Sequence, residues 1–439
     1  MFKQTDRTWA SCLRTLRRDK ILTSRKNIVN DNNFSSGGLR RGAVSVAMVT
    51  QLLLAGVTAG WGIHRYQVIQ DEKTPPQPVL KPKRYEPRYD RPEIVSDEQL
   101  QRVLLKLQPR LRGGKPQIDH VDHALRFWGV EAKFTDQDSL SGEELRRLLL
   151  DHRSFAGAWG QKTKPFLLPQ TRDDVELLSF RTKSGAATAS HVDHTLAALA
   201  ECGTPLDYPV LTPKGELPLR AAFDQTFREF SLNQVEYEWS SLVFLHYLPH
   251  AASWFTTEGQ RVTWDLLADR MMRQRLAHGV CYGQHRLHAL ALLLIADEEH
   301  HWLSAETRQR IITHLKDITH RLVAAQHDDG YWDERWPGDE SDGPQAEHVG
   351  PLGAMGNRLL VTGHTLEWWA FAPAEVLPPE EKLSLAAQWL IHTIDDLSES
   401  EVRRYYTFLT HAGRSLALWR SRRPADVVTG LSHVGTASN

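Results

Sequence analysis

The sequence predicts an all-α fold, an (α/α)6 toroid of six helical hairpins behind a single N-terminal transmembrane helix. The first observation is a repeat: residues 120–125 and 191–196 share the pattern His-Val-Asp-His-x-Leu. A histidine opens an apolar segment three more times, at His285, His364 and His411. The second observation is that apolar segments alternate with amphipathic ones through residues 95–424. This alternation is what two concentric rings of helices require.

Two sets of helices are expected within residues 95–424. The amphipathic, outer helices are predicted near residues 96–109, 141–153, 217–231, 262–276, 304–325 and 379–396. The inner helices are apolar nearly all round and are predicted near residues 118–130, 190–201, 236–248, 284–297, 358–371 and 403–420. A helix that is apolar on every side has to be surrounded by others. An open superhelical stack of the same hairpins is the alternative architecture.

Composition excludes several classes of protein. The apolar content of 41% and the charged content of 24% are ordinary for a folded chain. A net charge of −1 gives no basic footprint for a phosphate backbone, so no nucleic acid is expected as a partner. Cys12 precedes the apolar N-terminal segment, so Cys202 and Cys281 could form at most one disulfide in the body of the protein.

The N-terminal region predicts a membrane anchor. Residues 42–64 are expected to form the transmembrane helix, because about 20 apolar residues span the core of a bilayer. Residues 1–41 are basic, which places them in the cytoplasm and the rest of the chain outside it, in the periplasm of a bacterium. A signal peptide cleaved after Ala59 is the alternative.

Two further segments flank the predicted toroid. Residues 65–94 are rich in proline, which favours an extended spacer that would hold the body away from the membrane. Residues 425–439 are expected to be a flexible tail.

The histidines of the inner helices are the first candidate site. In a closed ring the inner helices all run in the same direction, so His123, His194, His285, His364 and His411 would gather at one rim. The positive end of a helix dipole and burial both disfavour imidazolium. A neutral imidazole is what a general base or a metal ligand needs. The alternative is a repeated structural contact between each helix and its neighbouring hairpin.

Candidate catalytic residues lie in the last two thirds of the chain: His285, His364, Glu367 and Cys281. Glu367 follows His364 by about one helical turn and could form an acid–base pair with it. Cys281 and His285 resemble half of a zinc site, but no Cys-x-x-Cys or His-Glu-x-x-His motif accompanies them. The sequence therefore predicts no metal site, and it names no cofactor.

Candidate ligand-binding residues are His123, His194, Asp193, Trp239, Trp368 and His411. Asp193 precedes His194 and could orient it. Tryptophans on inner helices could stack on sugar faces, although core packing explains them equally well.

One motif resembles a known family. Residues 326–332, Gln-His-Asp-Asp-Gly-Tyr-Trp, resemble the Gln-x-x-Asp-Gly-x-Trp motif of terpenoid cyclases of the squalene–hopene type, which belong to the toroid superfamily that also includes prenyltransferases. The resemblance implies that Gln326, Asp329 and Trp332 brace the ends of outer helices. The catalytic Asp-x-Asp-Asp motif of the cyclases is absent from the sequence, so terpenoid chemistry is not implied.

Three functions follow as hypotheses. The first is an extracytoplasmic, membrane-anchored domain that binds a glycan or a peptide in its central cavity. The second is a lyase, hydrolase or epimerase that uses His285, His364 and Glu367; the stretch 363–368 also resembles helix starts in sugar epimerases and uronate-processing enzymes. The third is a scaffold for other envelope proteins.

Overall fold

The computed structural model describes residues 37–113, 116–182, 185–338 and 353–428 of the chain. It divides into two units, residues 1–68 and residues 69–439. The described part of the first unit is helical and belongs to α1 (Gly37–Lys73). Most of the basic segment 1–41 and all of residues 429–439 lie outside the described residues.

The prediction of a transmembrane helix is wrong. Residues 42–64 are helical within α1, but no helix in the described part of the chain is long and apolar enough to cross a membrane. Thr50, Gln51 and Thr58 and several glycines interrupt the apolar run, and such residues reduce the favourable transfer of a helix into lipid. The side chains of residues 37–47 and 67–73 lie outside the described residues. The localisation that depended on this helix stays an untested prediction.

Helices occupy both sets of expected ranges in the second unit. The inner helices are α3 (Ile118–Trp128), α6 (His194–Glu201), α8 (Glu238–Tyr247), α10 (Gln284–His300), α12 (Gly353–Trp369) and α15 (Tyr406–Leu418). The outer helices are α2 (Asp97–Lys106), α4 (Gly142–Leu150), α7 (Arg220–Glu229), α9 (Trp264–Arg273), α11 (Ala305–Ala325) and α13 (Glu380–Asp396). The shorter helices are α5 (His152–Trp159), η1 (Leu276–His278), η2 (Val280–Gly283), η3 (Ala374–Val376) and α14 (Glu399–Arg404).

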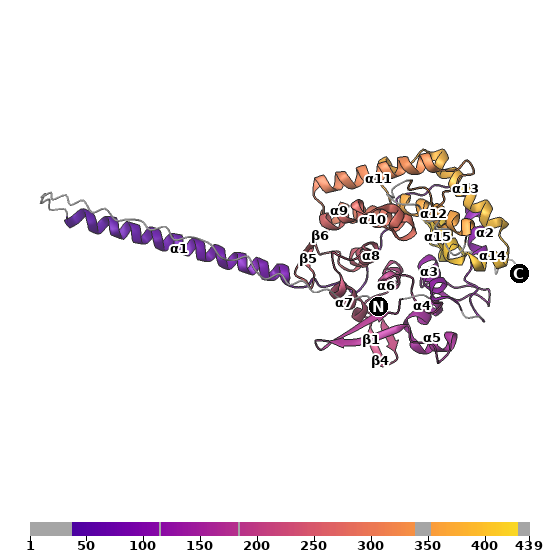
Figure 1. Ribbon diagram of the computed structural model, residues 1–439, viewed down its shortest axis with the longest axis horizontal. Coiled ribbons are helices and arrows are strands. Elements are labelled where there is room, and N and C mark those ends of the chain that lie inside the picture. The colour runs from indigo at the N-terminus through magenta and orange to yellow at the C-terminus, as the bar shows by residue number, and fades with distance from the viewer. Residues whose placement is uncertain (1–36, 114–115, 183–184, 339–352, 429–439) are drawn as a thin grey trace, which may run out of the picture. The chain divides into compact units, whose positions relative to one another are not determined.

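The inner helices contact one another in cyclic order. α3 packs on α6, α6 on α8, α8 on α10, α10 on α12, α12 on α15, and α15 returns to α3 (Figure 1). The outer helices pack against this ring, for example α4 against α3, α9 against α10 and α13 against α12. The inner helices are buried along most of their length, which explains why their sequences are apolar on every side.

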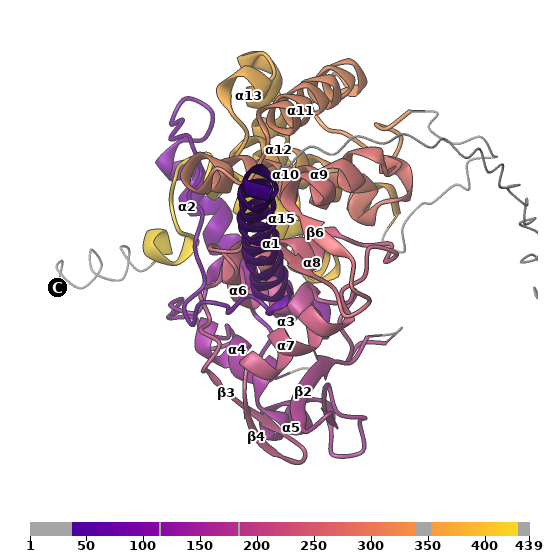
Figure 2. The same cartoon turned by 90° about the vertical axis from the view of Figure 1, so that its left-hand side faces the viewer.

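The prediction of an all-α fold is also wrong, because three antiparallel hairpins are inserted between the helices. They pair β1 (Leu167–Arg172) with β2 (Val175–Phe180), β3 (Pro209–Thr212) with β4 (Gly215–Pro218), and β5 (Ser253–Phe255) with β6 (Arg261–Thr263). The first hairpin turns at Asp173 and Asp174, both at positive φ, as a tight two-residue turn requires. β1 to β4 lie beside α5, at one end of the unit (Figures 1 and 2).

The proline-rich segment 65–94 is not a free spacer where it is described beyond α1. Its backbone N–H groups at Val79, Lys83, Arg88 and Arg91 donate to carbonyls at the C-terminal ends of α8, α12 and α15. The last carbonyls of a helix have no partner inside the helix. The segment satisfies several of them and lies across this end of the ring.

At the other end of the chain, packing continues beyond residue 424. Ala425 and Val428 are buried, although a flexible tail was predicted to begin at 425.

The motif at 326–332 joins two outer helices. The Gln326 side-chain amide donates to the Gly330 carbonyl at 2.9 Å and to the carbonyl of Lys382, in the first turn of α13, at 3.0 Å. Trp332 is fully buried and donates to the Leu322 carbonyl of α11 at 2.7 Å. Asp329 is exposed. Gln326 and Trp332 thus brace the helix ends.

A close approach of α12 and α15 explains one glycine. A Cβ at Gly363 would lie 2.8 Å from the Ala412 backbone nitrogen, so Gly363→Ala forces the two helices apart. We expect this substitution to lower the free energy of unfolding by about 1–3 kcal/mol, measured by urea denaturation. Gly157→Ala, where the new Cβ meets nothing within 4 Å, is the matched control and should be neutral or slightly stabilising. An unchanged midpoint for Gly363→Ala would mean that the helices are not packed this closely.

Candidate functional site

One aromatic side chain from each inner helix contacts its neighbours around the axis of the helix ring. In order the residues are His123, His194, Trp239, His285, His364 and His411, which we call the rim cluster. Successive ring centroids are separated by 4.8, 4.4, 4.2, 4.3 and 3.7 Å, and His411 closes the circle on His123 at 5.1 Å. All six side chains are buried.

The rim cluster brings together residues from separate parts of the sequence. Five of its members are the repeated histidines, and the sixth, Trp239, stands where α8 has no histidine. The closed order of the inner helices creates this convergence, because equivalent positions of helices that run in the same direction face one axis.

Carboxylates fix the orientation of three of the histidines. Asp122 lies 3.0 Å from His194 Nδ1, and Glu367 Oε2 lies 3.0 Å from His364 Nδ1 and 3.1 Å from His411 Nδ1. Because Nδ1 of His364 faces a carboxylate, it carries the proton and Nε2 keeps its lone pair. His364 Nε2 is buried and has no hydrogen-bond partner among the described residues.

Burial lowers the pKa values of most histidines in the rim cluster. Burial lowers the pKa of His123 to about 4, although Asp119 opposes the shift. Burial also holds the pKa values of His285, His364 and His411 well below the ordinary value. His194 is the exception: burial disfavours its charged form, but the Asp122 carboxylate outweighs this effect and raises its pKa. Four of the five histidines therefore have the lowered pKa that favours a neutral imidazole.

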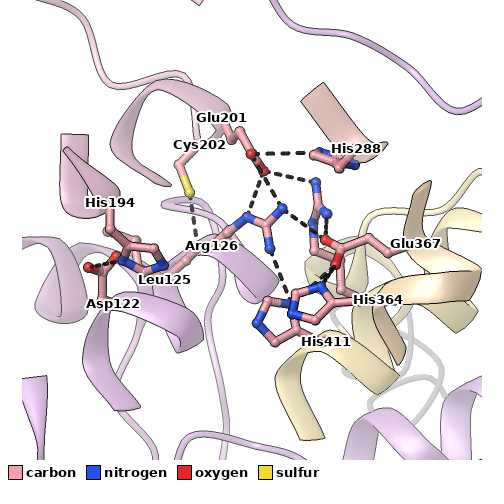
Figure 3. A network of polar contacts seen from close by, with 11 residues as sticks. Asp122, Leu125, Arg126, His194, Glu201, Cys202, His288, His364, Glu367 and His411 are labelled. Carbon is pink, nitrogen blue, oxygen red and sulfur yellow. Dashed lines mark hydrogen bonds and ion pairs between the residues drawn. The ribbon is translucent and has the colours of Figure 1, made fainter. Parts of the chain in front are cut away.

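A second layer of side chains lies next to the rim cluster and consists of Arg126, Glu201, Glu367 and Arg414, which we call the charged layer. Figure 3 shows Arg126 between Glu201 and the pair His364 and His411. Arg126 contacts Glu201 at 2.8 Å and Glu367 at 2.9 Å. Arg414 contacts Glu201 at 3.0 Å and also pairs with Glu367. Two positive and two negative groups thus neutralise each other inside the ring.

Sequence reasoning missed Arg126, Glu201 and Arg414, although a signal for two of them was present. Arg126 follows His123 by three residues, and Arg414 follows His411 by three, the spacing that places Glu367 below His364. Side chains three positions apart lie on one helix face. A charged residue at this spacing in an otherwise apolar helix indicates a second polar layer.

Two cavities lie at opposite ends of the ring. The smaller cavity, of about 110 Å³, is lined by every member of the rim cluster except His364, and also by His191, Asp119 and Cys281. We call it the rim pocket. The larger cavity, of about 440 Å³, lies at the C-terminal ends of the inner helices, between the charged layer and the proline-rich segment, and includes Arg84, Arg126, Glu201, His288 and Arg414.

Two predicted ligand-binding residues lie away from the rim pocket. Trp368 is fully buried in the core. Asp193 does not contact His194 as expected; its carboxylate accepts hydrogen bonds from Thr226 Oγ1, at 2.8 Å, and from Ser240. Asp193 precedes α6 with φ +63° and does not cap the helix with its side chain, so the carboxylate instead links the start of α6 to α7 and α8.

Cys281 reaches the rim pocket through an unusual backbone. Cys281 and Tyr282 have φ values of +50° and +56°, and Gly283 follows at +78°. A left-handed conformation is uncommon for residues other than glycine, and it persists where surrounding structure enforces it. Burial raises the pKa of the Cys281 thiol. The fold thus holds a thiol beside the imidazoles of the rim cluster.

Two groups of side chains within the described residues could hold a metal ion. They are Cys281 with His285 and His364, and His364 with Glu367 and His411; within each group the ligand atoms all lie within 4.8 Å of one another. Glu367 is already paired with both arginines of the charged layer, so the second group has little free acceptor capacity.

Comparison of the chain with protein-family models, with curated proteins and with solved structures gives no match. The function has to be argued from the rim cluster, the charged layer and the two cavities.

Proposed function

We propose that the protein binds a small polar ligand in the rim pocket. The observation that carries this proposal is the convergence of five histidines, a thiol and the Asp119 carboxylate on one pocket of about 110 Å³. The size of the pocket limits the ligand to a few atoms, or to one small group of a larger molecule such as a glycan or a peptide.

The stability cost of this arrangement supports a binding role. Burying polar and ionisable groups disfavours folding unless all of them find partners. A core selected for stability alone would fill these positions with apolar side chains. The buried Trp239 Nε1 lines the pocket and has no hydrogen-bond partner among the described residues, so it can donate to an acceptor on a ligand.

A second candidate function is acid–base catalysis of the lyase, hydrolase or epimerase type through His285, His364 and Glu367. The 3.0 Å contact between His364 and Glu367 favours it, because a carboxylate strengthens an imidazole as a base. His285 lines the rim pocket and its ring lies 4.3 Å from that of His364, so His285 would contact the substrate.

Thermal unfolding in the presence of small ligands tests the binding proposal. We expect at least one of acetate, glycine, glucuronate, N-acetylglucosamine or a short peptide to raise the midpoint at millimolar concentration, with EDTA present to remove metal ions. A ligand at one hundred times its Kd stabilises a protein by about 2.7 kcal/mol.

The matched control is His285→Phe, which keeps an aromatic ring against Trp239 but removes both nitrogens from the pocket. The stabilisation should disappear in this variant. A shift of equal size in wild type and His285→Phe would place the ligand elsewhere, and no shift with any ligand would contradict the proposal.

A further inference from the structure

We propose that Cys281, His285 and His364 form a binding site for a zinc-class transition-metal ion. The inference names a ligand for the rim pocket and in that sense rests on the function proposed above. Its basis is the position of three donor atoms, one sulfur and two imidazole nitrogens, which lie within 4.8 Å of one another.

The distances suit a single ion. Metal–ligand bonds of about 2.0–2.3 Å place two donors of one tetrahedral zinc ion about 3.3–3.8 Å apart. The three donor atoms lie within 4.8 Å of one another, so the side chains need an inward movement of roughly 1 Å to bind one ion. His285 and Cys281 approach from the start of α10 and His364 from α12, and these two helices pack together.

The second observation is the unpartnered His364 Nε2. This atom is buried, has no hydrogen-bond partner among the described residues, and keeps its lone pair because Nδ1 faces Glu367 at 3.0 Å. A carboxylate behind a histidine is the usual outer contact of a metal-bound imidazole. Glu367 is fixed in turn by Arg126 and Arg414, so His364 is held in one orientation.

The types of donor select the class of ion. Thiolate and imidazole are ligands for zinc and related transition metals, whereas calcium and magnesium prefer oxygen. On binding, the Cys281 thiol releases its proton to solvent, and the two neutral imidazoles donate lone pairs. No oxidation or reduction takes place.

An open fourth position connects the metal site with the pocket. Three protein ligands plus one exchangeable ligand is the pattern of zinc sites that do chemistry, whereas structural sites have four protein ligands. Cys281 and His285 line the rim pocket, whose volume of about 110 Å³ holds a water molecule or a small ligand group beside the ion.

Metal analysis of the purified full-length chain tests the inference. We expect about one zinc ion per chain, removable by a strong chelator and restored by added Zn²⁺. With Co²⁺ in its place, a thiolate-to-cobalt charge-transfer band should appear in the near ultraviolet. Cys281→Ser should remove this band, and His285→Gln or His364→Gln should weaken Co²⁺ binding at least tenfold.

The matched control is Cys202→Ala. The Cys202 thiol is buried too, but it contacts the Leu125 carbonyl and belongs to neither group of potential ligands. This variant should keep both the metal and the band. All variants carry Cys12→Ser, so that the N-terminal thiol contributes nothing.

Two results would overturn the metal site: less than a tenth of an equivalent of zinc or cobalt bound to the wild type, or a charge-transfer band that survives in Cys281→Ser. If Cys281→Ser does not fold, X-ray absorption of the zinc-bound wild type decides, because one sulfur at about 2.3 Å is expected beside nitrogen or oxygen at about 2.0 Å. A spectrum without sulfur contradicts the proposal.

The two experiments distinguish a failure of the metal site from a failure of the proposed ligand binding. Ligand-dependent stabilisation in EDTA without any zinc binding would keep the pocket and remove the metal site. Zinc binding without stabilisation by any ligand of the panel would do the reverse.

Discussion

Glu201→Gln is expected to lower the free energy of unfolding by about 3–5 kcal/mol, the usual cost of removing one member of a buried ion pair. Glu201 contacts Arg126 at 2.8 Å and Arg414 at 3.0 Å, and the side chains of all three are at most 14% exposed. When Glu201 loses its charge, Arg126 and Arg414 have only the carboxylate of Glu367 as a partner in the charged layer. Urea denaturation of the wild type and the variant measures the loss.

Two controls separate this effect from a general response to mutation. Asp395→Asn removes an ion pair with Arg102 at the surface, where the arginine is 53% exposed, and should cost less than about 1 kcal/mol. Replacing a buried pair by apolar residues removes both charges together. The double variant Arg126→Met, Glu201→Leu should therefore be more stable than Glu201→Gln. Equal small losses for Glu201→Gln and Asp395→Asn would show that the charged layer is open to solvent.

Acidification from pH 7.5 to pH 5 is expected to destabilise the protein strongly. His123 has its pKa lowered to about 4 by burial among Asp119, Asp122, His194 and His411, whereas the unfolded chain binds a proton below about pH 6.5. Stability from this group is complete above pH 6.5 and is lost as the pH falls toward 4. The loss at pH 5 is about 2 kcal/mol for His123 alone.

His288 adds to this acid sensitivity. Its pKa is held well below the ordinary value, first by burial and then by Arg126 and Arg414, while Glu201 opposes the shift. His194 acts in the opposite direction, because its raised pKa stabilises the folded state at low pH. His123, His285, His288, His364 and His411 all have pKa values lowered by burial, whereas only that of His194 among these buried histidines is raised, so the net effect is a loss.

Urea denaturation at several pH values, with EDTA present, measures this dependence. His123→Gln removes one of the responsible groups, so its stability should fall by about 2 kcal/mol less than that of the wild type between pH 7.5 and pH 5. A free energy of unfolding that stays constant over this interval would mean that these histidines are accessible to protons in the folded state.

The sequence by itself determined the helices and the rows of repeated histidines. Periodicity placed α11 and α13 correctly because each shows one apolar face, and α10 because it is apolar on every side. Local chemistry also sets the start of α2, where Ser96 and Gln99 form a capping box. The transmembrane helix was predicted wrongly because residues 42–64 lack Asp, Glu, Lys and Arg, although their threonines, glutamine and glycines make the stretch less apolar.

The tertiary structure alone decided which of these features meet. Sequence patterns give the face of a helix but not the identity of the residue opposite it, so the pairing of Arg126 with Glu201 and of His194 with Asp122 could not be read from the chain. The sequence also did not show that the left-handed backbone at Cys281 places a thiol near His285 and His364. Nor did it show that backbone N–H groups of the proline-rich segment bind carbonyls at helix ends that are distant in the sequence. Contacts between distant segments depend on how helices close into a ring, and that closure is a property of packing over the whole chain rather than of any local stretch.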